Sequence, residues 1–262
     1  MAAPAIPPIS IPIPPYLLPS IDRINAALEV AVEQPPPATG TLRVCQATED
    51  EWNAFAITDG NVVHANFLEW FADTEEIHMI EFDNTPHAMY IAELSLSTFD
   101  EPCVRRWLKG YSSAANLLGT RWCPDMSYGP RRTTPGSVLP PGVSSFVEFR
   151  TIKIGIGVSQ PWGMARRQLD RKAISVWAKM PGVEYALCVK FDPDFTNAEY
   201  KLYDARANPL VPVDPVLIVA PRTVIHLDGR RILGVPPDMA LPSFFPEILS
   251  VDLYGPLIRA ME

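Results

Sequence analysis

The 262-residue chain has few cysteines and no long apolar run. Its four cysteines, Cys45, Cys103, Cys123 and Cys188, are widely separated and fit neither a zinc motif nor a disulfide framework. No apolar run is long enough to span a membrane, and the chain does not open with the basic and apolar segments of a secretory signal. We therefore expect buried free thiols in a soluble protein of the cytoplasm or nucleus that does not bind membranes.

Basic residues are scarce relative to acidic ones. The chain has 22 Lys and Arg against 30 Asp and Glu, which gives a formal net charge of −8. This balance argues against a protein that binds nucleic acid over its whole surface, because such binding draws on many contacts between basic side chains and phosphates. Basic residues do concentrate between positions 131 and 172, where they predict a local nucleic-acid-binding face. The residues of this basic face are Arg131, Arg132, Arg166, Arg167 and Arg171.

Proline, by contrast, is abundant, with 29 residues. Residues 1–19 alternate proline with aliphatic residues, and such a segment favours an extended conformation because proline fixes φ and lacks a backbone donor. The expected organisation is therefore an arm, a short helix over 20–33 and a linker up to residue 40, followed by one folded domain over 41–262. The sequence leaves open whether the arm lies on its own domain, binds a second subunit to form a homo-oligomer, or is a flexible leader.

The hydrophobic pattern after residue 41 predicts an α/β domain with a mixed central sheet flanked by helices. Thr48 and Glu51 have the spacing of a capping box at the start of a helix. We expect further helices over 64–73, 100–118 and from Pro161 to about residue 180, and strands over 41–46, 76–82, 87–94, 121–129, 146–159, 183–191, 199–205 and near 215–227.

Asp125 is the first candidate site residue. It lies in "RWCPDMSYGP", within the strand predicted over 121–129, which precedes a loop rich in proline and glycine. Magnesium-dependent cleavage of a phosphodiester needs oxygen ligands that converge on one point, commonly with a lysine nearby. The predicted order of strands and helices could bring such groups together. The alternative is that Asp125 caps a turn and that Lys172 lies on the solvated face of a helix.

Four segments of this region resemble the PD-(D/E)XK nuclease superfamily, and in particular its restriction-endonuclease-like branch called the Uma-two family. They are "CPDMSYGP", "IKIGIGVSQPWG", "RRQLDRKAISVWA" and "GVEYALCVKFDPD", and the upstream "MIEFDNTPHAMYI" is similar to the opening hairpin of that family. The resemblance covers roughly residues 75–235. It implies a restriction-endonuclease-like fold, a nucleic-acid substrate and a magnesium cofactor.

The resemblance places Asp125 at the metal-binding aspartate, Lys172 at the helix lysine and Glu81 at the upstream acid. It also shows one departure, because Gly155 stands where the family pattern has a glutamate. Glu148, earlier in the same β-rich run, is an alternative acid. Two hypotheses follow. In the first, Asp125 with Glu81 or Glu148 holds magnesium and Lys172 assists attack on a phosphodiester. In the second, the chain is a catalytically inactive interaction or scaffold protein on the same fold.

Overall fold

The computed structural model describes residues 13–34, 42–58, 61–63, 67–71, 74–79, 85–111, 116–117, 120–121, 124–158, 160–165, 168–192 and 195–262. Most of the predicted arm, residues 1–12, lies outside these ranges, as do Glu81, Arg166 and Arg167. No helix within the ranges is long and apolar enough to cross a bilayer. Among the described cysteines, all free, Cys188 is buried and Cys103 is exposed, so burial was predicted correctly for the first and wrongly for the second.

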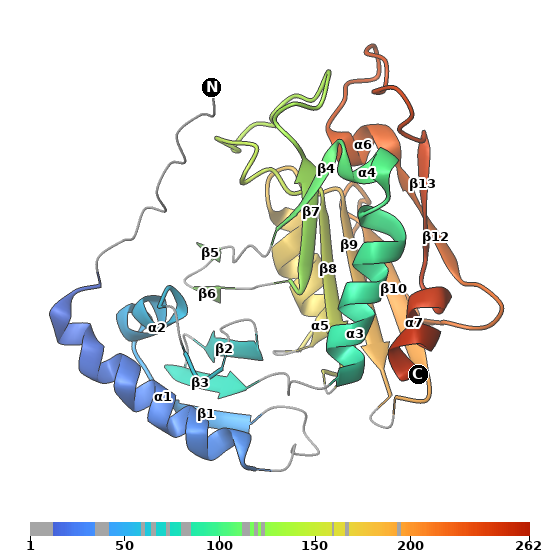
Figure 1. The fold of residues 1–262 in the computed structure, drawn as a ribbon. Helices are drawn as coiled ribbons and strands as arrows, with labels where there is room; N and C mark the ends of the chain where they lie inside the picture. The colour runs from blue at the N-terminus through green and yellow to red at the C-terminus, as the bar shows by residue number, and fades with distance from the viewer. Residues whose placement is uncertain are drawn as a thin grey trace, which may run out of the picture.

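A six-stranded mixed sheet forms the larger part of the molecule (Figure 1). Its strands β8 and β9 are parallel, whereas every other neighbouring pair is antiparallel. Parallel neighbours need a crossover connection, which here contains the helical segments α5 (Leu169–Arg171), η4 (Lys172–Val176) and η5 (Trp177–Lys179). In spatial order the strands are β11 (Val216–Leu217), β10 (Ala198–Asp204), β9 (Tyr185–Phe191), β8 (Ile152–Gly157), β7 (Met126–Pro130) and β4 (Leu108–Tyr111).

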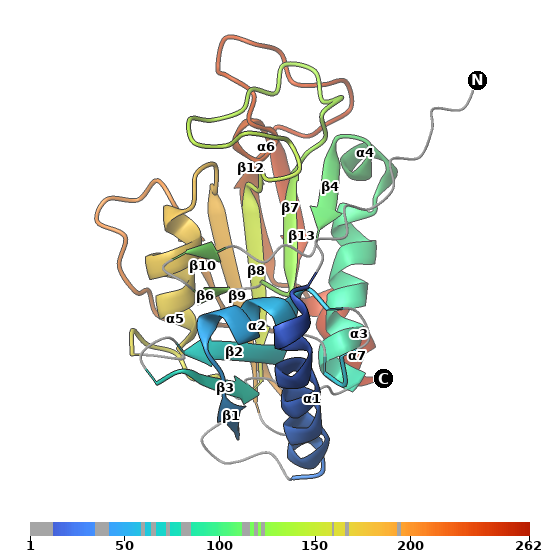
Figure 2. The same cartoon turned by 90° about the vertical axis from the view of Figure 1, so that its left-hand side faces the viewer.

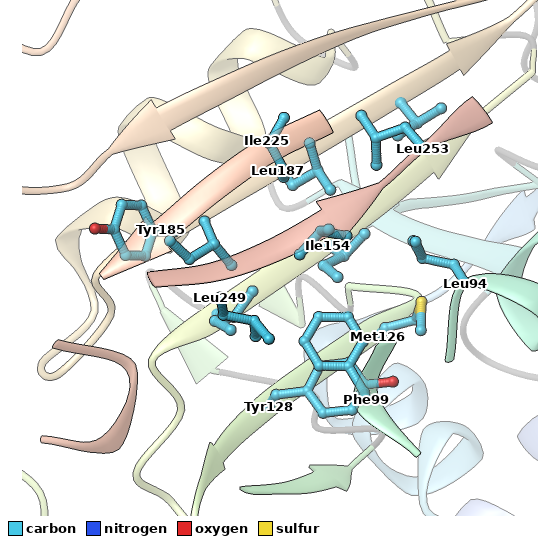
Figure 3. Packing of buried hydrophobic residues seen from close by; sticks show 14 of the residues in the cluster. Leu94, Phe99, Met126, Tyr128, Ile154, Tyr185, Leu187, Ile225, Leu249 and Leu253 are labelled. Atoms are coloured by element: carbon cyan, nitrogen blue, oxygen red, sulfur yellow. The ribbon is translucent and has the colours of Figure 1, made fainter. Parts of the chain in front are cut away.

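Both faces of this sheet are covered, and α5 and α3 lie on opposite sides of it (Figure 2). Successive side chains of a strand point to opposite faces, so Ile154 of β8 points into the larger core while Gly155 faces the crossover helix. Figure 3 shows how Ile154 packs with Met126, Tyr128 and Leu187 in that core. The layer on this side consists of α3 (Thr85–Leu94), η3 (Ser95–Phe99), β12 (Val224–Asp228), α6 (Gly229–Leu233), β13 (Ile248–Asp252) and α7 (Tyr254–Met261).

A smaller lobe precedes the large sheet. Its three-stranded antiparallel sheet has the order β1 (Leu42–Gln46), β3 (Glu76–Met79) and β2 (Leu68–Phe71). The helices η1 (Pro15–Leu17), α1 (Leu18–Val32) and α2 (Glu49–Ala56) share one hydrophobic cluster with this sheet, from Leu17 to Met79. The domain boundary predicted between residues 40 and 41 therefore separates two segments that pack in one hydrophobic cluster. The remaining elements are α4 (Pro102–Arg105), β5 (Asn116–Leu117) and β6 (Thr120–Arg121).

The predicted α/β class and several local predictions are confirmed. The sheet is mixed and flanked by helices, as the hydrophobic pattern indicated. The helix expected over 20–33 is α1, and the strands expected over 183–191 and 199–205 are β9 and β10. The capping box is present, because the Thr48 side chain accepts from the backbone of Glu51 and the Glu51 side chain accepts from the backbone of Thr48.

Three predicted elements are wrong. The helix expected over 64–73 contains the strand β2, whose four residues are all buried and therefore show no alternation from which to predict a strand. The strand expected over 87–94 belongs to α3, where Tyr90 and Leu94 are fully buried at helical spacing and Pro86 occupies the first turn. The helix expected over 100–118 ends early at α4, because the chain then enters β4 and pairs with β7.

Candidate functional site

Asp125 lies immediately before β7, the strand next to the edge strand β4 of the large sheet. The pairing of Met126 with Ile154 continues by one residue to place Asp125 opposite Gly155. Its carboxylate oxygen Oδ2 accepts a hydrogen bond of 2.7 Å from the backbone N–H of Ile156. Burial raises the pKa of the Asp125 carboxyl, while the nearby His87, the Ile156 N–H and the charge of Lys172 act in the opposite direction. Asp125, which is partly exposed, is therefore the centre of a polar cluster.

His87, on the first turn of α3, is the second member of the cluster. Its Nε2 atom lies 3.1 Å from the carbonyl oxygen of Ile156 and 3.7 Å from Oδ1 of Asp125. Since a carbonyl oxygen can only accept, Nε2 carries the hydrogen in this contact. The backbone of Ile156 thus fixes both groups: its N–H binds Asp125 and its carbonyl binds His87.

Lys172 and Glu69 complete the cluster from two other elements. Lys172 begins a π-helical turn of the crossover, and its Nζ lies 3.4 Å from Oε2 of Glu69 on β2. Both side chains are buried, and neither carboxylate oxygen of Glu69 has a hydrogen bond within the described part of the chain. The Lys172 charge also lowers the pKa of Asp125, so the lysine lies within electrostatic reach of both acids. The ion pair between Lys172 and Glu69 joins the smaller lobe to the crossover helix of the large sheet.

Gly155 occupies the position where the resemblance predicts an acid, and the indole ring of Trp177 fills the space above it. A Cβ atom at position 155 would lie 2.6 Å from Cη2 of Trp177, closer than side-chain carbons approach. Trp177 is fully buried in a cluster with Leu169, Ala173 and Cys188. Position 155 therefore lacks a carboxylate and also lacks the room for one.

Glu148, the alternative acid, is not brought to Asp125. It precedes β8 by four residues, toward the end of that strand away from Asp125. Residues 146–148 form a turn instead of a strand, and Oε2 of Glu148 accepts from the backbone N–H and the hydroxyl of Ser144. These hydrogen bonds lower the pKa of the exposed Glu148 carboxyl. Its partners are those of a loop residue.

Two described residues of the predicted basic face, Arg131 and Arg132, also lie apart from Asp125. Arg131 and Arg132 follow β7, whereas Asp125 precedes it, so the whole length of the strand separates them. Arg131 donates from Nε to the carbonyl oxygen of Arg105, and Arg132 and Arg171 are exposed. The binding of nucleic acid by these residues stays a prediction.

Two members of the cluster, Glu69 and His87, were missed in the sequence. Glu69 stands inside the apolar run "FLEWF", and an acid flanked by buried aromatic residues is a signal of a functional or paired carboxylate. The segment was instead interpreted as a helix over residues 64–73, and Glu69 was not singled out. His87 follows Pro86 directly and was assigned to a strand, which hid its position on the first turn of α3.

An open cavity of about 380 Å³ lies beside Asp125, between α3 and the strands β4 and β7. Asp125 is the only charged residue of its described lining. The other lining residues are Ile91, Ala92, Ser95, Gly110, Met126, Ser127 and Tyr128. The cavity can therefore admit solvent or a small group to one acid, and it brings no second carboxylate to that acid.

The described donors do not form the two-acid magnesium site that the resemblance implies. Within the ranges that the structure describes, no three His, Cys, Asp or Glu side chains lie close enough to hold a metal ion. One oxygen of Asp125 is already bound by the Ile156 N–H, Glu69 faces Lys172, and position 155 offers no ligand. Glu81 lies outside the described residues.

Comparisons with known proteins give little further guidance. No family model and no curated protein matches the chain. Among solved structures, the chain is similar to a protein from Anabaena variabilis described as a "putative nuclease belonging to DUF820". The two are 15% identical with a TM-score of 0.43, over 80% of this chain and 98% of the other. A likeness of this extent carries no argument about activity.

Proposed function

We propose that this chain is a restriction-endonuclease-like protein that does not cleave phosphodiesters and acts as a non-catalytic interaction protein. One observation carries the proposal: Gly155, directly opposite Asp125, replaces the expected acid, and Trp177 fills the space that an acid would need. If a single substitution had replaced an acid by glycine at position 155, the space of the lost side chain would be empty. Here the neighbouring helix supplies a large aromatic side chain, so the two positions fit each other without a metal ligand.

The surroundings of Asp125 and Lys172 support the same proposal. Burial raises the pKa of Asp125, which acts against the deprotonated form that a metal ligand needs. Lys172 faces the buried carboxylate of Glu69, so much of its charge is directed at an internal partner. Neither Asp125 nor Lys172 therefore has the surroundings that the resemblance implies for a metal ligand and a catalytic lysine.

A cleavage assay tests the proposal. Single-stranded and double-stranded DNA and RNA are incubated with the purified chain in Mg²⁺ or Mn²⁺, alongside the Asp125→Ala variant. We expect no cleavage above that of the variant. Cleavage by the wild-type chain that Asp125→Ala abolishes would overturn the proposal.

A magnesium-dependent endonuclease is the second candidate, favoured by one observation on Glu69. Its two buried oxygens have no hydrogen bond among the described residues, and they lie beside a lysine that also acts on Asp125. Buried oxygens without partners are typical of sites that bind a further group. This candidate predicts cleavage that Glu69→Gln abolishes and Glu148→Gln leaves unchanged, since Glu148 is bound to Ser144 instead.

A further inference from the structure

A row of exposed aliphatic side chains follows the outer edge of the large sheet. We call it the aliphatic edge; its members are Val211, Val213, Val216, Leu217 and Val219, and each exposes between 44% and 60% of its surface. Val216 and Leu217 form β11, the last strand of the sheet, which pairs only with β10. Grouped apolar side chains on a surface mark interaction sites, because their exposure to water is unfavourable.

Prolines determine how a partner can bind this edge. Pro209, Pro212, Pro215 and Pro221 flank the aliphatic residues, and each lacks the backbone N–H that an added strand would need. Extension of the sheet by strand addition is therefore disfavoured. A partner must instead pack on the side chains. Asp214 is the only charged residue from 208 to 221, so this partner is expected to be apolar and uncharged.

The amino-terminal residues 1–12 of the chain have that chemistry. They contain no charged side chain, and Ile6, Ile9 and Ile11 alternate with prolines. Such a segment cannot form a regular sheet ladder, but it can lay aliphatic side chains along an apolar edge. A proline-rich segment extends about 3.1 Å per residue, so twelve residues reach roughly 37 Å.

Ile13, which residues 1–12 precede, and the aliphatic edge lie in different parts of the molecule. The described chain begins at Ile13, which packs on the hydrophobic cluster of the smaller lobe. In Figure 1 that lobe lies to the left of the large sheet, whereas β10, the neighbour of β11, lies toward the right. We propose that residues 1–12 of one copy bind the aliphatic edge of a second copy, and that the chain forms a dimer by reciprocal arm exchange.

A dimer with two-fold symmetry can form two of these contacts between an arm and an aliphatic edge. Each copy carries one arm and one aliphatic edge, so two copies related by a two-fold axis place both arms on both edges. The proposal is independent of the activity at Asp125, because neither segment belongs to the polar cluster. It names the partner as the chain itself.

The test measures mass in solution by size-exclusion chromatography with light scattering. The full chain is expected at twice its mass of 29.0 kDa. A variant lacking residues 2–12 and the double variant V216D/L217D are each expected at the mass of one chain. Val147→Asp is the matched control, since Val147 exposes 61% of its surface elsewhere, and it is expected to remain dimeric. Circular dichroism melting checks that all variants fold.

A mixing experiment separates arm exchange from other modes of association. The arm-deleted variant retains the edge, and V216D/L217D retains the arm, so an equimolar mixture can form one arm–edge contact. We expect the mixture to show mass above that of one chain where each variant alone does not. A monomeric full chain, a dimer that survives arm deletion, or a mixture that stays monomeric would each overturn the proposal.

Discussion

Two buried ion pairs lie at opposite ends of one row of residues that crosses the large sheet. The strand registers align Gly155 of β8, Cys188 of β9 and Lys201 of β10, and continuing the pairing by one residue beyond β7 adds Asp125. At the β10 end, Lys201 donates to both oxygens of Asp170 at 2.9 and 3.1 Å, and the Tyr203 hydroxyl donates to the same carboxylate at 2.7 Å. This carboxylate is fully bound.

At the β7 end a lysine again faces a buried carboxylate, but this carboxylate has fewer hydrogen bonds. Lys172, two residues after Asp170, lies 3.4 Å from Glu69, and the Glu69 oxygens accept no hydrogen bond from described residues. Buried polar groups are normally satisfied, and exceptions concentrate where function has shaped the site. The two ends therefore differ in how far their carboxylates are satisfied: Asp170 is fully hydrogen-bonded, whereas Glu69 accepts no hydrogen bond from described residues.

The largest expected effect tests the satisfied pair. Asp170→Asn keeps the side-chain shape but leaves the Lys201 charge buried without its counter-charge. Removing one partner of such a pair costs about 3–5 kcal/mol of the free energy of unfolding. Urea denaturation with an unchanged m-value measures this cost.

Two further variants decide whether the comparison holds. Glu69→Gln is expected to cost less than Asp170→Asn, because its ion pair with Lys172 is longer, at 3.4 Å, and its oxygens accept no hydrogen bond from described residues. Arg43→Gln removes the ion pair between Arg43, which is largely exposed, and Glu76, so we expect a much smaller change in the free energy of unfolding. An equal cost for Glu69→Gln and Asp170→Asn would show that the two ends do not differ.

The middle of the row gives a smaller effect. Gly155→Ala forces a methyl group against the ring of Trp177 at 2.6 Å, and overpacking of this kind costs about 1–3 kcal/mol. The matched control is Gly157→Ala, whose Cβ would meet the flexible end of Leu169 at 3.2 Å and which should cost less.

A double-mutant cycle assigns the cost to the indole ring. In a Trp177→Phe background the contacting ring atom is gone, so Gly155→Ala should cost less there than in the wild-type chain. An unchanged cost would mean that the glycine is required for another reason. In that case the fit between Gly155 and Trp177 would no longer support the proposal that the chain does not cleave phosphodiesters.

The sequence predicted those parts of the row that depend on local pattern. The segments "VEYALCVKF" and "EYKLYDA" predicted β9 and β10, and the Pro-Asp pair singled out Asp125, which lies directly before β7. Glu69 escaped because all of β2 is buried, which removes the periodicity that would reveal a strand. The fit of Trp177 to Gly155 escaped for a different reason. A sequence shows a glycine, whereas the ring above it depends on strand register and on the path of the crossover helix.

The smallest effect is a pH dependence at the β7 end. Burial raises the pKa of Asp125, so the folded chain holds this proton more tightly than the unfolded chain. The free energy of unfolding then decreases as pH rises from about 4, the ordinary value for an aspartate, through the raised pKa. Asp125→Asn removes this decrease. We therefore expect the stability of the variant relative to wild type to increase with pH across that window, as measured by urea denaturation at a series of pH values.

Glu148→Gln supplies a control of opposite sign. Hydrogen bonds from Ser144 lower the pKa of Glu148, so this carboxylate stabilises the folded chain above its ordinary pKa and loses that contribution as pH falls through the lowered value. The stability of Glu148→Gln relative to wild type should accordingly decrease as pH rises. Because Glu148 is exposed, its slope should be the shallower of the two and should weaken in high salt. Slopes of the same sign in both variants would show that Asp125 is solvated like a loop acid, and the contrast between the two ends of the row would then rest on Glu69 alone.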